Sequence, residues 1–525
     1  MHVVRSWLTG RSACGVIALC GLLQAAATVH AQSEPMAKMA PPISIHPENP
    51  KYFLFRGKPL ALIAAGEHYG SVVNRAFDFD RYLADAAEKK QTVTRTFLLF
   101  REQQSSRNPS SPIKPESPDY LAPWVRTGPG KAMDGEPTYD LDRWNEEYFS
   151  RLHKFLERAG QLGVVVELTL FSNTYGDNVW ALNPLRAANN VQKIGAVEWQ
   201  EYTSLKDSSL NARQMAYAQK VVQETSRFDN IYYEICNEPG GGFAGHASPA
   251  DVDAWQAEVG RVVRAELKKL GRTQLVFASQ AFSYTPKFTQ ELDATFSGSL
   301  ADAANVHPLP NTVLGGRAYM LGNFMSKELT LAELIDFCRA AQHYPKPCVM
   351  DEDNTASLYR DSTGWTIHRK RAWVSALGQA HYDFIDFSVT VGSETGTKES
   401  SAQIRIWMKH LSEFLHAFDF VHASPVADWI ERKPAHLVSA ALAVPGKDYV
   451  AYLADAREVT DPAAGEPIQG EISFRLPSGD YRVELVSPTT GGRSPGLKVQ
   501  GGMEPIKLDL PEFRHDIVVQ ARRLP

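Results

Sequence analysis

Two acidic residues in this 525-residue chain each follow a short apolar run, with one residue in between. Glu238 follows the run that begins at Ile231, and Pro239 and three glycines come next. Glu352 follows the run that begins at Cys348. One carboxyl group of such a pair can protonate a leaving oxygen while the other attacks a carbon atom or activates water. Two acids facing each other across a site are the minimum needed to cleave a glycosidic bond.

The elements that would position these acids alternate regularly along the chain. Each apolar run has the length of a strand that is buried on both faces, and amphipathic stretches with helix caps separate the runs. The runs cover residues 60–65, 92–100, 164–171, 231–236, 275–279, 303–306, 348–350 and 384–390. This rhythm predicts a (β/α)8 barrel over residues 45–421. Catalytic residues of such barrels lie at the carboxyl ends of strands, here the fourth and the seventh.

Three consecutive acids end the seventh run. Successive strand residues point to opposite faces, so Glu352 should face away from both Asp351 and Asp353. We expect Glu352 to face the site and its two neighbours to be supporting or surface residues. Glu394, after the eighth run, is a further candidate.

The Asn-Glu-Pro triplet that ends the fourth run, together with the acid that ends the seventh, resembles clan-A glycoside hydrolases, especially those similar to the cellulase-like family 5. The resemblance implies that Glu238 is the acid/base, that Asn237 binds the sugar 2-hydroxyl and that Glu352 is the nucleophile. Arg95 resembles the arginine of the second strand that steadies the nucleophile. His307 matches a histidine or tyrosine position near the sixth strand. The eighth run lacks the tryptophan that many clan members carry there.

The resemblance implies a retaining β-glycosidase that acts on a polysaccharide or oligosaccharide by double displacement. We expect a raised pKa for Glu238, so that it can donate a proton, and an ionised Glu352 beside Arg95. A carbohydrate-binding barrel without catalytic activity is the alternative. A metal-dependent hydrolase would need more histidines at strand ends than His68 and His307, so no metal or other cofactor is expected.

Other residues near the strand ends have two open interpretations. Glu67 and His68 follow the first run and could contact sugar or belong to a solvated loop. Two long connections, residues 101–140 and 172–208, carry aromatic residues that could bind sugar faces or pack the loops down. These aromatic residues are Trp124, Tyr175 and Trp180.

The beginning of the chain is typical of a secretory signal peptide. Arg5 and Arg11 precede an apolar run over residues 13–23, and small residues flank a cleavage point after Ala31. We therefore expect residues 1–31 to be removed and the protein to be secreted or periplasmic, without membrane insertion afterwards. The net charge of −5 gives no indication of a nucleic-acid partner.

From residue 422 onward the pattern changes to short runs separated by Gly, Pro, Ser and Asp. This pattern predicts an all-β module, a sandwich, over residues 422–525. We expect it to pack on the barrel and to take no part in the chemistry.

Beyond the signal peptide the cysteines are Cys236, Cys338 and Cys348, an odd number without metal-ligand spacing, which indicates neither a disulfide framework nor a zinc site.

Overall fold

The computed structural model describes residues 40–67, 69–101, 117–241, 247–283, 288–322, 327–353, 355–356, 359–427 and 429–525. The chain from Ala40 onward forms one compact unit. At its centre is an eight-stranded sheet in which all paired strands are parallel. In spatial order the strands are β4 (Ile63–Gly66), β18 (His381–Ile385), β17 (Cys348–Asp353), β14 (Ala303–Val306), β11 (Val276–Ala278), β9 (Ile231–Asn237), β8 (Val165–Ser172) and β5 (Val93–Phe97).

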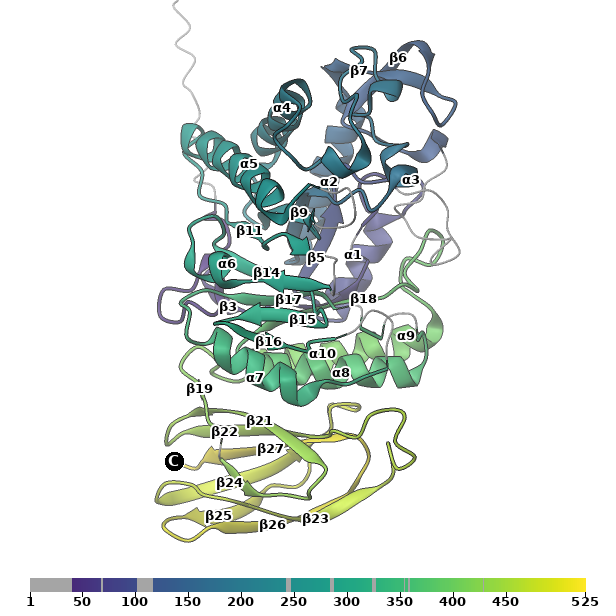
Figure 1. Cartoon of the computed structure of the whole chain (residues 1–525). Helices are drawn as coiled ribbons and strands as arrows, with labels where there is room; N and C mark the ends of the chain where they lie inside the picture. Colours follow the sequence, from purple (N-terminus) through teal and green to yellow (C-terminus); the bar gives the residue numbers. More distant parts are fainter. Residues whose placement is uncertain are drawn as a thin grey trace, which may run out of the picture. The chain divides into compact units, whose positions relative to one another are not determined.

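This sheet closes into the predicted (β/α)8 barrel (Figure 1). Thr92, just before β5, donates its backbone N–H to the carbonyl oxygen of Ile63 in β4 at 3.0 Å, which joins the two ends of the strand order. Every residue of the eight strands is buried, as expected where helices cover the outside and side chains fill the inside.

The position predicted for the eighth strand was wrong by several residues. The apolar pattern places it at 384–390, whereas β18 begins at His381 and ends at Ile385. Polar residues open this strand because the fold satisfies them. The His381 ring accepts the N–H of Leu62 at 2.9 Å and lies 3.0 Å from the carbonyl oxygen of Lys51. A hydropathy pattern does not register such a buried, hydrogen-bonded histidine.

Helices alternate with the strands along the chain. The longer ones are α1 (Phe79–Glu88), α2 (Glu146–Leu162), α4 (Ser208–Thr225), α5 (Pro249–Lys269), α7 (Leu331–Ala341), α8 (Ser362–Leu377) and α10 (Ile404–His416). The short helices are α3 (Asp177–Trp180), α6 (Asp293–Ser297) and α9 (Lys398–Ala402). The helix α5 begins with a well-formed cap: Ser248 and Asp251 form a reciprocal capping box, and Pro249 occupies the first helical position.

Several connections fold into small sheets. The first long connection contains a hairpin of β6 (Trp124–Lys131) and β7 (Pro137–Trp144), which leads into α2. The chain after β9, β11 and β14 builds a five-stranded sheet of β10 (Gly240–Gly241), β12 (Phe282–Ser283), β13 (Thr289–Glu291), β15 (Asn311–Leu314) and β16 (Arg317–Tyr319). A third sheet consists of β1 (Ser44–Ile45), β2 (Phe53–Phe55) and β3 (Lys58–Leu60).

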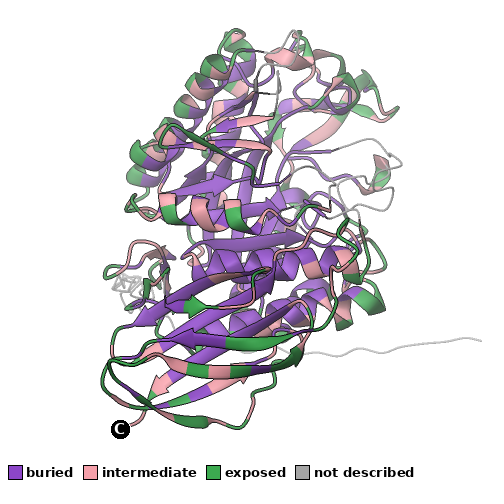
Figure 2. Ribbon diagram, turned by 60° about the horizontal axis from the view of Figure 1, so that its bottom comes forward, coloured by how far each residue is buried: buried purple, intermediate pink, exposed green. Residues whose placement is uncertain are grey.

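The C-terminal region is a β-rich module of two antiparallel sheets that enclose their own apolar core. One sheet contains β19 (Ser424–Pro425), β21 (Leu437–Val444), β22 (Asp448–Asp455), β27 (Asp516–Arg523), β24 (Gly479–Val486) and β25 (Leu497–Gly501), and the other contains β20 (Ile430–Arg432), β23 (Ile468–Phe474) and β26 (Ile506–Phe513). The module packs on the barrel, as expected, because Leu442, Tyr452 and Val518 belong to the same apolar cluster as barrel residues. Figure 2 shows the buried strands and helices at this junction.

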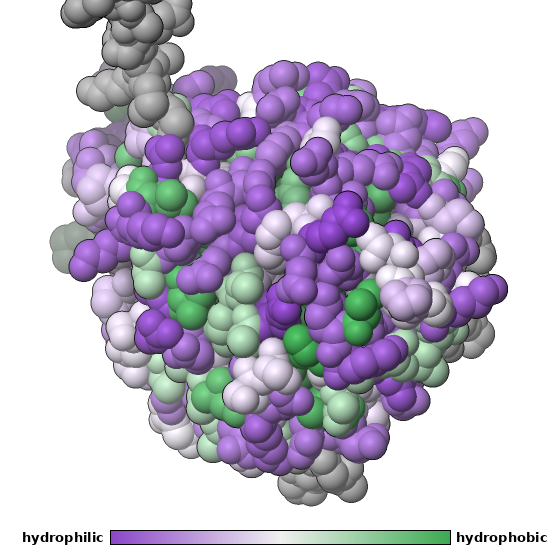
Figure 3. Space-filling model, turned by 90° about the horizontal axis from the view of Figure 1, so that it is seen from above, coloured by the Kyte–Doolittle hydropathy of each residue, from purple (hydrophilic) through white to green (hydrophobic). Residues whose placement is uncertain are grey.

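Cys236, Cys338 and Cys348 are buried and free. Within the described ranges, no helix combines the length and apolar character needed to cross a membrane. The face in Figure 3 is largely hydrophilic, with small separate apolar patches.

Candidate active site

Glu238 stands at the carboxyl end of β9, where the chain turns sharply. Its φ is +42°, an uncommon value for a non-glycine residue, and the next residues pair with β12 as strand β10. The side chain is buried. Its Oε1 lies 3.1 Å from Nδ1 of His307, and its Oε2 accepts the hydroxyl hydrogen of Tyr175 at 2.6 Å.

The pKa of Glu238 contradicts the expectation from the sequence. Burial alone would raise it, but the hydrogen bond and positive charge of His307, with the hydrogen bond from Tyr175, lower it below its usual value. The pKa of His307 rises correspondingly to about 10, because its contacts with Asp351 and Glu238 outweigh the opposing effect of burial. The opposite directions of these two pKa shifts favour a carboxylate on Glu238 beside a protonated His307.

Glu352 lies in β17, next to an irregularity in the pairing of that strand. The register with β18 shifts between Met350 and Asp353, and the φ of Glu352 is +55°. Its Oε1 accepts the hydroxyl hydrogen of Tyr69 at 3.0 Å, and its Oε2 accepts a hydrogen bond from Nη1 of Arg95. Two fixed donors thus stabilise Glu352 as a carboxylate.

The bulge also overturns the simple alternation expected of the three consecutive acids. Asp351 is fully buried, with Oδ2 3.5 Å from Nε2 of His307 and 3.4 Å from Nη2 of Arg95, so it reaches the same cluster as Glu352. Only Asp353 points away from the cluster, toward Arg371 of α8. The additional residue in the bulge lets two successive side chains approach one site.

Arg95 lies at the bottom of the cluster and connects its two sides. Besides Glu352, the guanidinium group donates to both carboxylate oxygens of Glu234 at 2.7–3.0 Å and to Oδ1 of Asn237 at 2.8 Å. The amide nitrogen of Asn237 donates in turn to the hydroxyl oxygen of Tyr175 at 2.8 Å. The structure therefore brings six predicted residues into one continuous network: Arg95, Tyr175, Asn237, Glu238, His307 and Glu352.

The two candidate catalytic carboxylates face each other across this network. One oxygen of Glu238, one ring nitrogen of His307 and one oxygen of Glu352 all lie within 4.8 Å of one another. A carboxylate fixed by two donors can act as a nucleophile, and a carboxyl group beside a protonated imidazole can exchange protons with it. The arrangement is therefore chemically capable of supplying a nucleophile and an acid/base from one buried site.

Two buried acids of the cluster, Glu234 and Glu167, were not predicted from the sequence. Glu234 accepts a hydrogen bond from Oγ1 of Thr169 at 2.6 Å, in addition to its bonds with Arg95. Glu167 accepts hydrogen bonds from Tyr232 at 2.9 Å and Asn305 at 2.7 Å. The available signal was an ionisable residue within an otherwise apolar strand, which is costly to bury unless it is paired.

The loop residues have mixed outcomes. Tyr175 lies at the site and is 38% exposed, so its ring remains accessible. Trp180 is fully buried and donates its indole N–H to Val197, so its assignment as a sugar contact was wrong. Trp124 is also buried, stacked on Trp144, and packs its loop.

The two residues after the first strand cannot be treated alike. Glu67 is buried, and its carboxylate accepts hydrogen bonds from the backbone of Tyr69 and Gly70 at 2.6 and 2.8 Å and from Ser71 at 3.0 Å. These bonds hold the turn that carries Tyr69, the donor to Glu352. His68 lies outside the described residues.

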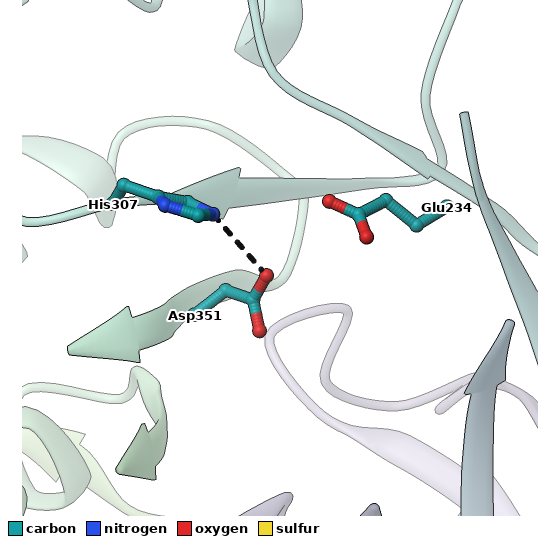
Figure 4. Close-up of side chains that lie close together, drawn as sticks. All are labelled: Glu234, His307 and Asp351. Atoms are coloured by element: carbon teal, nitrogen blue, oxygen red, sulfur yellow. Dashed lines mark ion pairs between the residues drawn. The ribbon is translucent and has the colours of Figure 1, made fainter. Parts of the chain in front are cut away.

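Two groups of side chains have donor atoms close enough to share a metal ion. Glu238, His307 and Glu352 form one, and Glu234, His307 and Asp351 form the other, shown in Figure 4. Arg95 donates hydrogen bonds to Glu234 and Glu352 and lies beside Asp351. Its fixed positive charge therefore already balances the carboxylates that a metal ion would bind. The same charge repels a second cation, and these residues are therefore a poor fit to a metal ion.

A sequence family described as a domain of unknown function (DUF6298) matches residues 114–230. That segment contains the hairpin β6–β7, the helices α2 and α4, and the barrel strand β8. No curated protein sequence matches the chain.

Solved structures resemble nearly the whole chain. A glycoside hydrolase of family 5 from Bacteroides vulgatus has a TM-score of 0.56 and 11% identity, over 93% of this chain and 95% of that one. A second structure, described as a glycoside hydrolase, has a TM-score of 0.58 and 12% identity, over 92% and 97% of the two chains. A third, from Bacteroides vulgatus and described as a glycoside hydrolase candidate, has a TM-score of 0.60 and 12% identity, over 92% and 82%. The fold is thus that of family 5 structures and consistent with clan A.

Proposed function

We propose that the protein is a retaining β-glycoside hydrolase in which Glu352 is the nucleophile and Glu238 the acid/base. The approach of the two carboxylates to within 4.8 Å carries this proposal. Retaining enzymes place the two groups about 5–5.5 Å apart, whereas inverting enzymes need about 6.5–9.5 Å to admit a water molecule between them. The observed separation favours direct attack by Glu352 on the sugar.

In the first step, Glu352 attacks the anomeric carbon and the bond to the leaving oxygen breaks. Glu238 delivers a proton to that oxygen, so the leaving group departs as an alcohol. Because the imidazole of His307 lies 3.1 Å from Oε1 of Glu238, it can supply this proton through Glu238. Arg95 and Tyr69 hold Glu352 ionised and oriented for the attack.

In the second step, Glu238 is a carboxylate and accepts a proton from water. The resulting hydroxide equivalent attacks the anomeric carbon, the ester with Glu352 breaks, and the sugar leaves with its original configuration. Arg95 and Tyr69 stabilise the negative charge that returns to Glu352. Asn237, whose amide is fixed between Arg95 and Tyr175, is oriented to contact a sugar hydroxyl.

The substrate class we propose is a polysaccharide or oligosaccharide with β-linkages. The names of the similar solved structures support a carbohydrate substrate, and the accessible ring of Tyr175 beside Glu238 suits the apolar face of a sugar. We also propose that the protein acts outside the cytoplasm or in the periplasm, on the strength of the signal-peptide pattern in residues 1–31.

A polysaccharide panel with product analysis tests the proposal. The protein should release sugars from at least one β-linked glycan, and proton NMR of the first product should show the anomer of the substrate. Glu238→Gln and Glu352→Gln should each abolish this release while preserving the fold. Binding of a glycan without any release by the wild type would support the non-catalytic alternative, and an inverted first product would exclude double displacement.

A further inference from the structure

Helix α8 has an unusual environment for the outer helix of a barrel. Its residues from Gly364 to Leu377 are almost all buried, including Arg369, Lys370 and Arg371. The outer helices of a barrel normally expose one polar face to water. Here the C-terminal module covers that face, so the charged residues of α8 must find partners inside the protein.

Two of these charged residues bind the module directly. Arg369 forms a bidentate ion pair with Asp516 at 2.8 and 2.9 Å, and both side chains are buried. The ammonium group of Lys370 donates to the backbone carbonyl oxygen of Asp455 at 2.8 Å. On the same helix, the ring of Trp373 stacks on Tyr452 with a centroid distance of 5.5 Å. These contacts tie the position of α8 to the module.

Arg371 points in the opposite direction, toward the barrel. Its Nε donates to Oδ2 of Asp353 at 2.5 Å, and its Nη1 donates to the carbonyl oxygen of Leu329 and the hydroxyl of Thr330 at 3.1 and 2.7 Å. The module holds this same backbone segment from the other side. The carboxylate of Glu458 accepts the N–H of Leu329 and the N–H of Thr330.

Asp353 is the residue directly after Glu352, at the end of the bulge in β17. It also accepts hydrogen bonds from the hydroxyl of Tyr382 at 2.9 Å and the N–H of Thr355 at 3.1 Å. Glu352 itself has a positive φ, a conformation that persists only where the surroundings enforce it. Anchoring Asp353 fixes one end of this strained residue, while Arg95 and Tyr69 hold its carboxylate.

From these contacts we propose that the C-terminal module positions Glu352 through Glu458, Arg371 and Asp353. The inference rests on the proposed role of Glu352 as nucleophile, and it revises the expectation that the module is irrelevant to the chemistry. Arg371 is a positioning residue, because it acts on Glu352 only through Asp353. If Glu458 no longer accepts the N–H groups of Leu329 and Thr330, Arg371 and Asp353 can move. The carboxylate of Glu352 then loses its alignment.

Glu458→Gln in the full-length chain tests the proposal. Glu458 is only partly buried, so the variant should fold. The matched control is Glu431→Gln, which removes a carboxylate that is ion-paired with Arg475 at 2.5 Å entirely within the module. On the aryl β-glycoside that the wild type cleaves fastest, Glu458→Gln should lower kcat about tenfold with little change in KM, since small misplacements of a reacting group are costly. Glu431→Gln should leave both constants unchanged.

A second readout needs no substrate. The guanidinium proton resonances of Arg95, identified by their loss in Arg95→Lys, report its contact with Glu352 in NMR spectra. They should shift or broaden in Glu458→Gln and stay unchanged in Glu431→Gln. A Glu458→Gln variant that melts at a lower temperature but keeps the wild-type kcat and Arg95 resonances would overturn the proposal. If the wild type cleaves no glycoside, the proposed function fails, but the Arg95 resonances still decide whether the module positions Glu352.

Discussion

Two regions of this molecule bury many charges, and they balance them differently. Among the described residues of the barrel mouth, the carboxylates of Glu167, Glu234, Glu238, Asp351 and Glu352 surround only Arg95 and His307. At the junction formed by α8, which lies between the barrel and the module, Arg369 pairs with Asp516 of the module and Arg371 pairs with Asp353 of the barrel. The mouth has a surplus of acids, and the junction does not.

This difference in charge balance distinguishes a region that can exchange protons from a region that holds the structure together. An acid surplus in a buried site requires some groups to hold protons: burial, with Asp351 and Glu234 nearby, raises the pKa of Glu167 well above its usual value. At the junction, burial would also raise the pKa of Asp353, but Arg371 and His368 lower it to about 2. Groups with shared protons can exchange them during a reaction, whereas permanently charged pairs only hold structure.

The largest expected effect comes from removing a carboxylate at the mouth. Glu238→Gln should reduce turnover of a natural glycan by about 10²–10⁴-fold, the range for losing a general acid. Glu352→Gln, which removes the nucleophile, should reduce turnover by several orders of magnitude. With an activated aryl leaving group, Glu238→Gln should keep much of its first step, because such a group needs little protonation. Steady-state and burst kinetics measure both.

Glu394→Gln is the matched control for those variants. Glu394 is another buried acid after a barrel strand, but its carboxylate accepts the N–H of Gly392 at 2.6 Å and supports its own loop. The control should retain nearly wild-type turnover. If Glu352→Gln were active and Glu394→Gln inactive, the nucleophile would be Glu394 instead.

At the junction, breaking an ion pair should affect stability far more than chemistry. Asp516→Asn leaves Arg369 buried without its partner, which should lower the free energy of unfolding by about 3 kcal/mol. Urea denaturation followed by circular dichroism measures this loss. Asp480→Asn, which removes an exposed pair with Lys498, should cost less than about 1 kcal/mol. Equal losses in the two variants would mean that the junction is not a stabilising contact.

An intermediate effect is expected from the pair of Glu238 and His307, whose shared proton should set the alkaline limit of activity. In the wild type, the imidazole keeps its proton until the pH approaches its pKa of about 10. In His307→Gln, the last proton resides on Glu238, whose pKa rises without the imidazolium because burial remains. The alkaline limb of kcat/KM on a natural glycan should therefore move to lower pH. An unchanged limb would show that His307 does not take part in this proton balance.

The barrel could be predicted from the sequence because most of its strands are continuous apolar runs. Such runs can be recognised locally, without knowing which distant residues they contact. The polar opening of β18 was missed, because His381 is satisfied only by residues of the barrel's first segment, Leu62 and Lys51. Long-range hydrogen bonds of this kind leave no local pattern. The same limit hid the role of Trp180, since a loop sequence does not reveal whether an aromatic ring turns inward.

At the site, the catalytic residue types could be predicted from the sequence, but their pKa values and contacts could not. The placement of Glu238 and Glu352 follows from strand order alone. The lowered pKa of Glu238 depends on a contact with His307 that joins two strands, and the approach of Asp351 depends on a bulge. Both features arise from tertiary geometry, which a single sequence does not encode in its local pattern.

The smallest expected effect is that of a metal chelator, which should leave glycosidase activity unchanged. Of the acids that come close enough to share an ion, Glu234 and Glu352 already receive hydrogen bonds from Arg95, and its charge repels a further cation. Activity measured after dialysis against EDTA, and again after addition of Zn²⁺, Ca²⁺ or Mg²⁺, provides the check. A loss of activity restored by one of these ions would contradict this prediction, and the acid surplus would then serve metal binding rather than proton exchange.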